Sequence, residues 1–145
     1  MYRKRPQQMN TPRDSGPDPT VTDIEREALQ NSAFRSALWT GEHLQTTLMS
    51  IPVRGEIGLE KHGDTDQFLR IEQGQGLVQM GRSANQLTKQ ERVHAGSAIF
   101  VPAGTWHNLT NIGRIPIKLY SIYAPPAHPH GTVHQTKADS DAEEH

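Results

Sequence analysis

Short apolar segments alternate with turn-forming residues along most of this chain. The segments are rich in Val, Ile, Leu, Thr and aromatic side chains, and Gly, Pro, Asn and Asp break the chain between them, which is typical of β-strands joined by turns. Only residues 21–30 have a helical pattern, with Ile24 and Leu29 loosely spaced. The predicted strands are 43–52, 56–62, 67–73, 76–81, 97–102, 106–111 and 115–124. Many short strands without a long amphipathic helix predict an all-β sandwich or barrel.

Both ends of the chain are polar and depart from this pattern. Residues 1–20 are expected to form a disordered tail, and its basic residues 3–5 are either a solvated terminus or a contact for an acidic partner. Residues 128–145 form a C-terminal extension whose last part is either a short helix or disordered. The sequence therefore predicts one folded β-barrel domain over residues 21–127.

Charge and cysteine content narrow the function classes. The chain has 145 residues, with 15 Lys and Arg against 16 Asp and Glu, so its net charge of −1 gives no global attraction for nucleic acid or an anionic membrane. Cysteine is absent, which excludes disulfides, thiolate nucleophiles and thiolate metal ligands. No apolar stretch follows the basic start or is long enough to span a bilayer. We expect a cytoplasmic protein that binds neither nucleic acid nor a membrane.

A strand, a tight turn and a return strand are predicted around Pro102. Five residues separate Gly96 from Pro102, one separates Pro102 from Gly104, two separate Gly104 from His107, and three separate His107 from Asn111. Pro102 restricts φ at the entry to the turn, and Gly104 allows backbone conformations closed to other residues. His107 then starts the return strand with its side chain directed to one face.

An earlier stretch supplies candidate partners for this histidine. Glu60 and His62 are two residues apart, so on a strand their side chains lie on the same face. A four-residue turn leads to Gln67, which a tight hairpin would place beside His62. If Gln67 faces inward, Leu69 and Ile71 do so too, and the inner face is apolar with a polar patch at its open end.

The spacing from Gly96 to Asn111 resembles the second motif of the cupin superfamily at each defined position. The resemblance covers roughly residues 43–124. Within the superfamily, the chain resembles small single-domain cupins of the mannose-6-phosphate isomerase-like group. The resemblance implies a double-stranded β-helix, or jelly-roll barrel, with a metal near the mouth. Cupins include isomerases, dioxygenases, decarboxylases and non-catalytic binding proteins, so the fold alone decides little about function.

The earlier stretch resembles the first cupin motif with altered ligands. His62 occupies the second histidine position, Glu60 stands where the first histidine is expected, and Gln67 stands where the glutamate is expected. Gly74 follows Gln67 at the spacing of the family, whereas Gly55 lies one residue too close. The implied set still holds one carboxylate and several neutral donors.

The resemblance implies that Glu60, His62, Gln67 and His107 hold one divalent metal ion. Two histidines and one carboxylate are common in non-haem iron sites, and we expect a preference for manganese or iron, with zinc or nickel as alternatives. Gln67 would add a weak oxygen ligand or bond to a metal-bound water. The alternative is a metal-free site, in which a Glu–His hydrogen bond compensates the buried carboxylate.

The expected function is that of a metal-dependent enzyme acting on a small, oxygen-rich substrate such as a sugar or sugar phosphate. The resemblance favours an isomerase, with the metal as Lewis acid and Glu60 or a bound hydroxide moving a proton. A metal-dependent dioxygenase is the alternative within enzymes. A non-catalytic small-molecule binding or sensor protein is the alternative from another class.

Alternative roles stay open for three further histidines and for a pair of tyrosines. His128, His130 and His134 form either a surface loop that wraps the barrel or a second metal site. Tyr120 and Tyr123 have opposite parities, so only one can line the cavity.

A homodimer formed through sheet-to-sheet contact is also expected. The segments 56–62 and 67–73 carry apolar residues on both faces, and a single barrel would leave some of these in water. The residues on which this expectation depends are Ile57, Leu59, Leu69 and Ile71.

Overall fold

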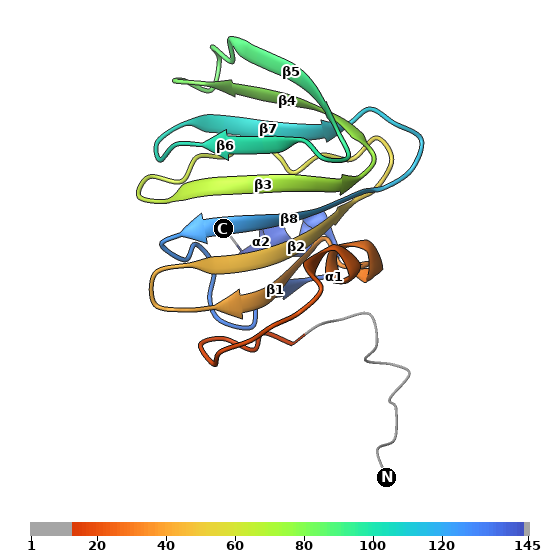
Figure 1. Ribbon diagram of the computed structural model, residues 1–145. Coiled ribbons are helices and arrows are strands. Elements are labelled where there is room, and N and C mark those ends of the chain that lie inside the picture. Colours follow the sequence, from red (N-terminus) through yellow and green to blue (C-terminus); the bar gives the residue numbers. More distant parts are fainter. Residues whose placement is uncertain (1–12, 144–145) are drawn as a thin grey trace.

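The computed structural model describes residues 13–143, which form two antiparallel sheets packed face to face. Figure 1 shows the strands stacked in order from β5 to β1. The larger sheet has the strand order β6 (Ala98–Val101), β3 (Asp66–Gln73), β8 (Ile117–Ala124), β2 (Gln45–Ile51), β1 (Arg35–Thr40) and β9 (Val133–His134). The smaller sheet has the order β5 (Lys89–His94), β4 (Gln75–Gly81) and β7 (Trp106–Asn111). This arrangement confirms the predicted all-β jelly-roll fold.

Inward-facing side chains form one apolar core between the two sheets. Along β3 and β8, buried residues alternate with exposed or half-buried ones, as expected for strands with one face in a core. The core includes Leu69 and Ile71 from the larger sheet and Val78 and Leu109 from the smaller one. The inner face predicted for β3 is therefore confirmed.

The polar end of the barrel can be located from the register of the larger sheet. Gln67 of β3 lies opposite Tyr123 of β8 and Val101 of β6, and Tyr123 lies opposite Gln45 of β2. These side chains form one row across the sheet, at the end of β2 away from Ile51. Gln67, Tyr123 and Gln45 are all buried, so polar groups are enclosed here.

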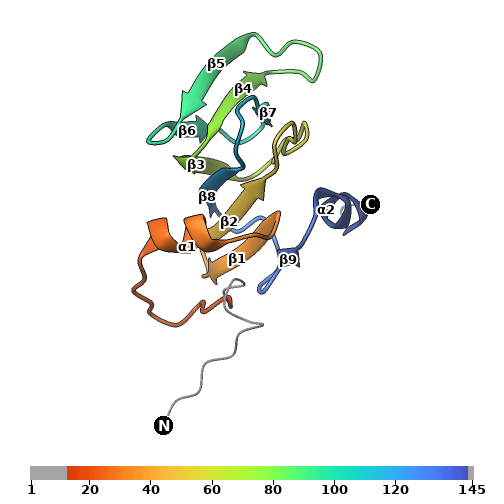
Figure 2. The same cartoon turned by 90° about the vertical axis from the view of Figure 1, so that its right-hand side faces the viewer.

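Two helices lie outside the barrel. α1 (Ile24–Gln30) begins at Asp23, whose side chain accepts a hydrogen bond from the backbone N–H of Arg26. Its Ala28 packs against Leu38 and Leu48 on the outer face of the larger sheet. α2 (Lys137–Glu143) follows β9 beyond β1, at the edge of the same sheet (Figure 2).

The predicted strand at 56–62 is wrong. This segment makes only isolated bridges, which pair Glu56 with Thr110 and Glu60 with His107 of the neighbouring β7. Gly58 has a φ of 105°, which breaks the alternation that a regular strand requires. The predicted hairpin between 56–62 and 67–73 is therefore absent.

Three strands lack a clear alternating pattern and were not predicted. β1 is buried on both faces over Arg35 to Leu38, and on its outer side Leu38 packs with Ala28 of α1. β5 is an edge strand with only Val93 buried. β9 is two residues long and pairs with β1 through His134 and Arg35.

More of the N-terminal and C-terminal segments packs against the barrel than the sequence predicted. Residues 1–12, including the basic residues 3–5, lie outside the described residues. From Asp14 the chain contacts β1: the carboxylate accepts a hydrogen bond from the backbone N–H of Thr40 (2.9 Å), and Trp39 Nε1 donates to the carbonyl of Asp18 (2.7 Å). At the other end, β9 adds part of the predicted extension to the larger sheet.

The reasoning behind the expected homodimer does not hold, although the homodimer itself stays a prediction. Of the four apolar residues behind this expectation, Ile57, Leu69 and Ile71 are buried within the core of a single chain, and only Leu59 is substantially exposed, at 41%.

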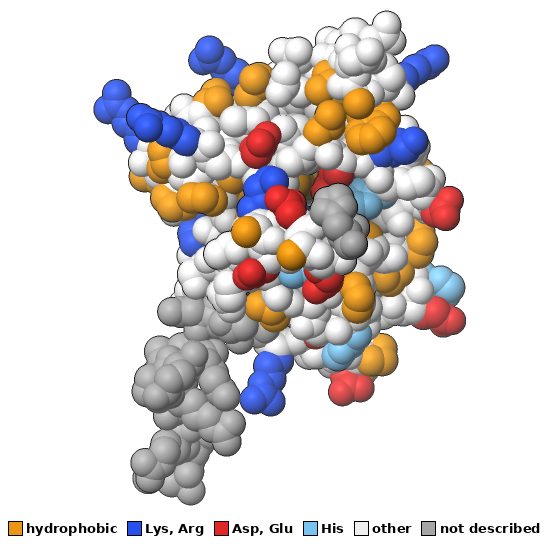
Figure 3. Space-filling view, turned by 180° about the vertical axis from the view of Figure 1, so that it is seen from behind, with side chains coloured by type: hydrophobic (Ala, Val, Ile, Leu, Met, Phe, Trp, Pro, Cys, Tyr) orange, Lys and Arg blue, Asp and Glu red, His pale blue; other side chains and the backbone are white. Residues whose placement is uncertain are grey.

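On the face shown in Figure 3, Lys and Arg side chains are scattered rather than gathered in one patch. No helix among the described residues is both long and apolar enough to cross a membrane.

Candidate metal centre

The backbone of β7 fastens the two predicted motifs together. Glu60 and His107 exchange two hydrogen bonds, from Glu60 N to the His107 carbonyl (3.0 Å) and from His107 N to the Glu60 carbonyl (2.9 Å). The carbonyl of His62 accepts a hydrogen bond from Gly104 N (2.8 Å), in the turn that precedes β7. Gly104 has a φ of 82°, which is the conformation that this turn required of a glycine. The motifs meet as predicted, but through β7 rather than through a hairpin.

Glu60, His62 and His107 direct one ligand atom each to a common point. These three atoms all lie within 4.8 Å of one another. Glu60 Oε1 is 3.0 Å from His62 Nε2 and 3.6 Å from His107 Nε2. Since nitrogen and oxygen ligands lie about 2.0–2.2 Å from a metal such as zinc, a cation between the three atoms needs only small side-chain shifts.

The hydrogen bonds of His107 leave one ring nitrogen available as a ligand. Its Nδ1 lies 3.0 Å from the carbonyl of Thr105, which can only accept a hydrogen bond, so Nδ1 carries the proton. In the neutral ring Nε2 then has a lone pair, and this atom is buried without a hydrogen-bond partner among the described residues. A histidine held by a backbone carbonyl in this way is the usual arrangement of a metal ligand.

Glu60 is held in its charged form. Burial is the largest influence and would raise the pKa of this carboxyl group, but the neighbouring imidazoles of His107 and His62 and the positive charge of Arg35 together bring the pKa well below its usual range. The carboxylate therefore stays ionised at neutral pH. An ionised, mostly buried carboxylate beside two imidazoles suits a divalent cation.

Gln67 faces the same interior from β3. It is 4% exposed, and its Nε2 donates to Ser121 Oγ (2.8 Å). Its Oε1 is buried without a hydrogen-bond partner among the described residues. The ring of Tyr123, which is paired with Gln67 across the sheet, lies 5.5 Å from the ring of His62. The amide oxygen is thus the group that Gln67 can offer to a ligand.

Only one of the two predicted tyrosine positions lines this interior. Tyr123 is fully buried beside His62, whereas Tyr120 packs with the cluster beneath α1. This agrees with the parity argument.

The C-terminal histidines do not form a second metal site. His128 lies against Tyr123 at 5.3 Å between ring centroids, and His134 is buried in β9. The Nε2 atom of His130 instead lies 2.8 Å from the carbonyl oxygen of Gly16. Within residues 13–143, the one group of three histidine or acidic side chains close enough to hold a metal is that of Glu60.

Sequence reasoning missed a charged residue near this centre. Arg35 is 1% exposed, and its Nη1 bonds to Ser140 Oγ (2.7 Å) and lies 3.2 Å from His134 Nδ1. The signal was present: Arg35 stands in the mostly apolar stretch Phe34–Leu38, where a charged side chain must find a polar interior or reach water.

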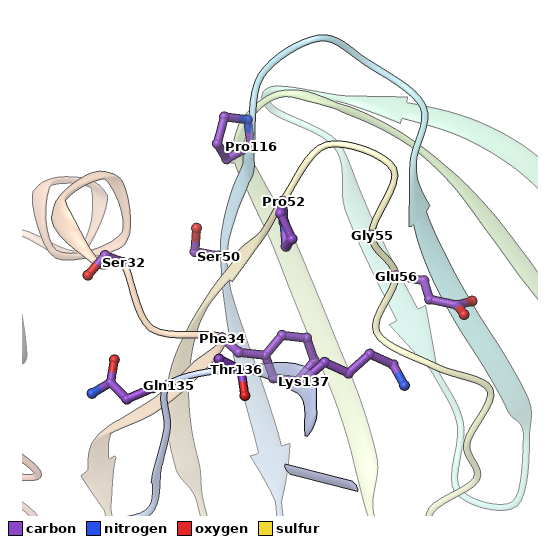
Figure 4. Close-up of a pocket in the computed structure, with 10 residues that line it drawn as sticks. All are labelled: Ser32, Phe34, Ser50, Pro52, Gly55, Glu56, Pro116, Gln135, Thr136 and Lys137. Carbon is purple, nitrogen blue, oxygen red and sulfur yellow. The ribbon is translucent and has the colours of Figure 1, made fainter. Parts of the chain in front are cut away.

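The pocket drawn in Figure 4 is a separate feature. It has a volume of about 270 Å³ and lies at the Ile51 end of β2, opposite the row that contains Gln67 and Tyr123. Pro52 and Phe34 supply its apolar wall, with Lys137 beside them (Figure 4). None of Glu60, His62 and His107 lines it.

Comparison with known proteins agrees with the geometry. The Cupin domain family matches residues 47–123. An uncharacterized Bacillus subtilis protein, YrkC, is 60% identical over 132 residues, which cover 91% of this chain and 71% of that protein. An uncharacterized mimivirus protein, L612, is 38% identical over 114 residues, covering 78% and 69% respectively.

A solved structure extends this likeness to three dimensions. The crystal structure of BH2720 from Bacillus halodurans superposes with a TM-score of 0.89 at 62% identity, and the match covers 90% of this chain and 98% of that one. The family match spans the strands from β2 to β8 and includes all four predicted ligand residues. On these grounds, the chain belongs to the cupin family.

Proposed function

We propose that this cupin is a mononuclear metal-dependent enzyme that acts on a small, oxygen-rich substrate. The observation that carries the proposal is the convergence of Glu60, His62 and His107 within 4.8 Å, with the His107 Nε2 lone pair buried and unpartnered among the described residues. A metal-free alternative, with only a Glu60–His62 hydrogen bond, would leave that nitrogen without a function. In this proposal the fourth donor is Gln67 Oε1, which is also buried without a hydrogen-bond partner among the described residues.

The donor set favours manganese or iron over zinc. Two imidazoles, a carboxylate and an amide oxygen are harder ligands than the histidine- and thiolate-rich sets of structural zinc sites. The cation supplies Lewis acidity and coordination positions for substrate oxygen atoms. Zinc and nickel stay as alternatives for the same ligands.

Glu60 serves as a ligand in this proposal rather than as a general base. A carboxylate whose pKa lies well below its ordinary value is a weak base, and general bases work best with a pKa near the working pH. His128 is no better placed, because burial, and then the charge of Arg35, lower its pKa to about 3.

The low basicity of Glu60 and His128 distinguishes the two enzymatic candidates. A sugar or sugar-phosphate isomerase that works through an enediol needs a base to take a proton from carbon, and neither Glu60 nor His128 is suited to that role. Many non-haem iron oxygenases use two histidines and one carboxylate with open coordination positions, and the side chains that converge here are of these types. We therefore place dioxygenation of a small substrate first and isomerisation second.

Metal content is the first test. Tag-free protein is analysed for metals as purified and after loading with Mn²⁺ or Fe²⁺, beside His62→Ala, His107→Ala and Glu60→Gln. The exposed His43 provides a matched control, since His43→Ala removes an imidazole that pairs with Glu42 and is not a predicted ligand. We expect about one metal ion per chain in the wild type and the control, and at least a tenfold loss in the three site variants. Equal metal content in all five proteins would remove the proposed centre.

Oxygen uptake distinguishes the reaction types. Protein loaded anaerobically with Fe²⁺ is mixed with panels of small hydroxy-, oxo- and sugar compounds, and oxygen consumption is recorded beside sugar isomerisation in Mn²⁺-loaded protein. Substrate-dependent oxygen uptake that is lost in His107→Ala supports a dioxygenase. Isomerisation without oxygen uptake would establish the second candidate, and metal binding without turnover or an exchangeable metal-bound water would favour a non-catalytic binding protein.

A further inference from the structure

Arg35 is a buried cation near the candidate metal centre that makes no direct ion pair among the described residues. It is 1% exposed, and none of the ion pairs among residues 13–143 includes it. The carboxylate of Glu143 is 3.2 Å from His134 Nε2 and pairs with that ring instead. Burying a guanidinium costs free energy unless anionic or polar groups compensate it.

Only one side of the guanidinium is occupied. Nη1 is held by Ser140 and His134, and the Phe34 ring lies 5.4 Å from the guanidinium carbon. Nε is buried and has no hydrogen-bond partner in the described part of the chain. Arginine binds carboxylates through pairs of parallel N–H groups, and the Nε side of the group offers such a pair. The side chain is therefore fixed at one edge and available at the other.

A continuous line of side chains joins this guanidinium to the metal centre. Ring centroids are 5.5 Å apart between His62 and Tyr123, 5.3 Å between Tyr123 and His128, and 6.3 Å between His128 and His134. The Tyr123 hydroxyl and His128 Nε2 are both buried without hydrogen-bond partners among the described residues. Unpartnered polar atoms thus lie along the whole path from Arg35 to His62.

The charges in this interior also call for an anion. Apart from its histidines, this interior encloses one carboxylate, that of Glu60, and one guanidinium, that of Arg35. A divalent cation at Glu60 would leave two positive charges in excess, in surroundings of low polarity. An anionic ligand that reaches both the cation and Arg35 would offset that excess.

We propose that Arg35, with the Tyr123 hydroxyl and His128 Nε2, forms a subsite that binds the carboxylate of a small substrate. The carboxylate lies against the Nε edge of Arg35, and the rest of the substrate extends toward Glu60, His62 and His107. This deepens the proposed function, on which it rests, by assigning the substrate to small hydroxy- or oxo-carboxylic acids.

Calorimetry on the full chain tests this subsite with three probes. Glycolate carries a carboxylate beside a hydroxyl group, methyl glycolate is its uncharged counterpart, and inorganic phosphate is an anion of different shape. Each is titrated into metal-free and Mn²⁺-loaded protein, for the wild type, Arg35→Lys and Arg35→Met. Arg92→Lys, on the exposed edge strand β5, is the matched control. Mn²⁺ affinity is measured separately for each protein.

We expect glycolate affinity to fall at least tenfold in both Arg35 variants while Mn²⁺ binding is retained, and to stay unchanged in Arg92→Lys. Methyl glycolate should bind at least tenfold more weakly than glycolate. Equal glycolate affinity in Arg35→Met and wild type would overturn the proposal, and phosphate binding as tight as glycolate would overturn the assignment to carboxylates.

Two further readouts separate the possible failures. If the wild type binds no Mn²⁺, the metal centre fails, but Arg35-dependent glycolate binding to metal-free protein still supports the subsite. If neither Arg35 variant folds, as judged by circular dichroism, the Arg35 Nε–H resonance of the wild type decides. Its displacement by glycolate supports the subsite, and an unmoved resonance refutes it.

Discussion

Asn111 is the residue whose removal should test most directly how the site is held in place. Its Nδ2 donates to the carbonyls of Ile51 (3.0 Å), Pro52 (3.2 Å) and Ile115 (3.0 Å), and its Oδ1 accepts from Gly113 N (2.9 Å). The side chain therefore ties the end of β7 to the loop that leads from β2 toward Glu60. Asn111 is 3% exposed, so water cannot replace these bonds without rearrangement.

The expected cost of Asn111→Ala follows from these bonds. The two amide protons and one oxygen make about three effective hydrogen bonds, each worth about 1 kcal/mol net, so the free energy of unfolding should fall by about 3 kcal/mol. Urea unfolding of metal-free protein measures it as a lower midpoint at unchanged slope. Asn85→Ala, at an exposed position, should change the same quantity by less than about 0.5 kcal/mol. A loss below about 1 kcal/mol for Asn111→Ala would refute the view that this side chain holds the loop.

Two other changes probe the charge of Glu60 and the turn before His107. Because the pKa of Glu60 is lowered from 4.5, its contribution to the stability of metal-free protein is present above that pH and is lost as the pH falls below it. Glu60→Gln should therefore flatten the acid limb of unfolding free energy against pH, and an unchanged limb would contradict the assignment. Gly104→Ala places a side chain at a φ of 82° and should cost about 1 kcal/mol in urea unfolding. Gly63 has open space around it and no positive φ, so Gly63→Ala should leave the free energy of unfolding unchanged. Equal losses in the two variants would argue against backbone strain at position 104.

The sequence predicted the three-residue centre better than it predicted the path that assembles it. Residue types and spacing identified Glu60, His62 and His107 as partners. The expected hairpin is absent, because Gly58 and the turn at Gly55 interrupt the chain before Glu60. The centre forms nevertheless, since one bridge to His107 restores the local strand geometry at Glu60.

The same local patterns explain which strands escaped prediction. Period-two alternation reports a strand with one buried and one exposed face. β1 is buried on both faces over most of its length, and β5 has only one buried residue, so neither strand produces that signal. The pairing of β9 with β1 depends on residues about 100 positions apart, for which a short polar segment gives no local indication.

Arg35 shows where single-sequence reasoning could have gone further. A charged residue within the mostly apolar stretch from Phe34 to Leu38 is costly to bury, so it requires a partner elsewhere in the chain. His134 and Ser140 meet part of that demand, and both come from the C-terminal segment that polarity alone assigned to an extension. The free Nε shows that the chain itself does not meet the rest within the described residues. A buried cation that its own fold satisfies only on one edge is better explained by binding than by stability, because an apolar side chain at position 35 would fill the same space without the desolvation cost.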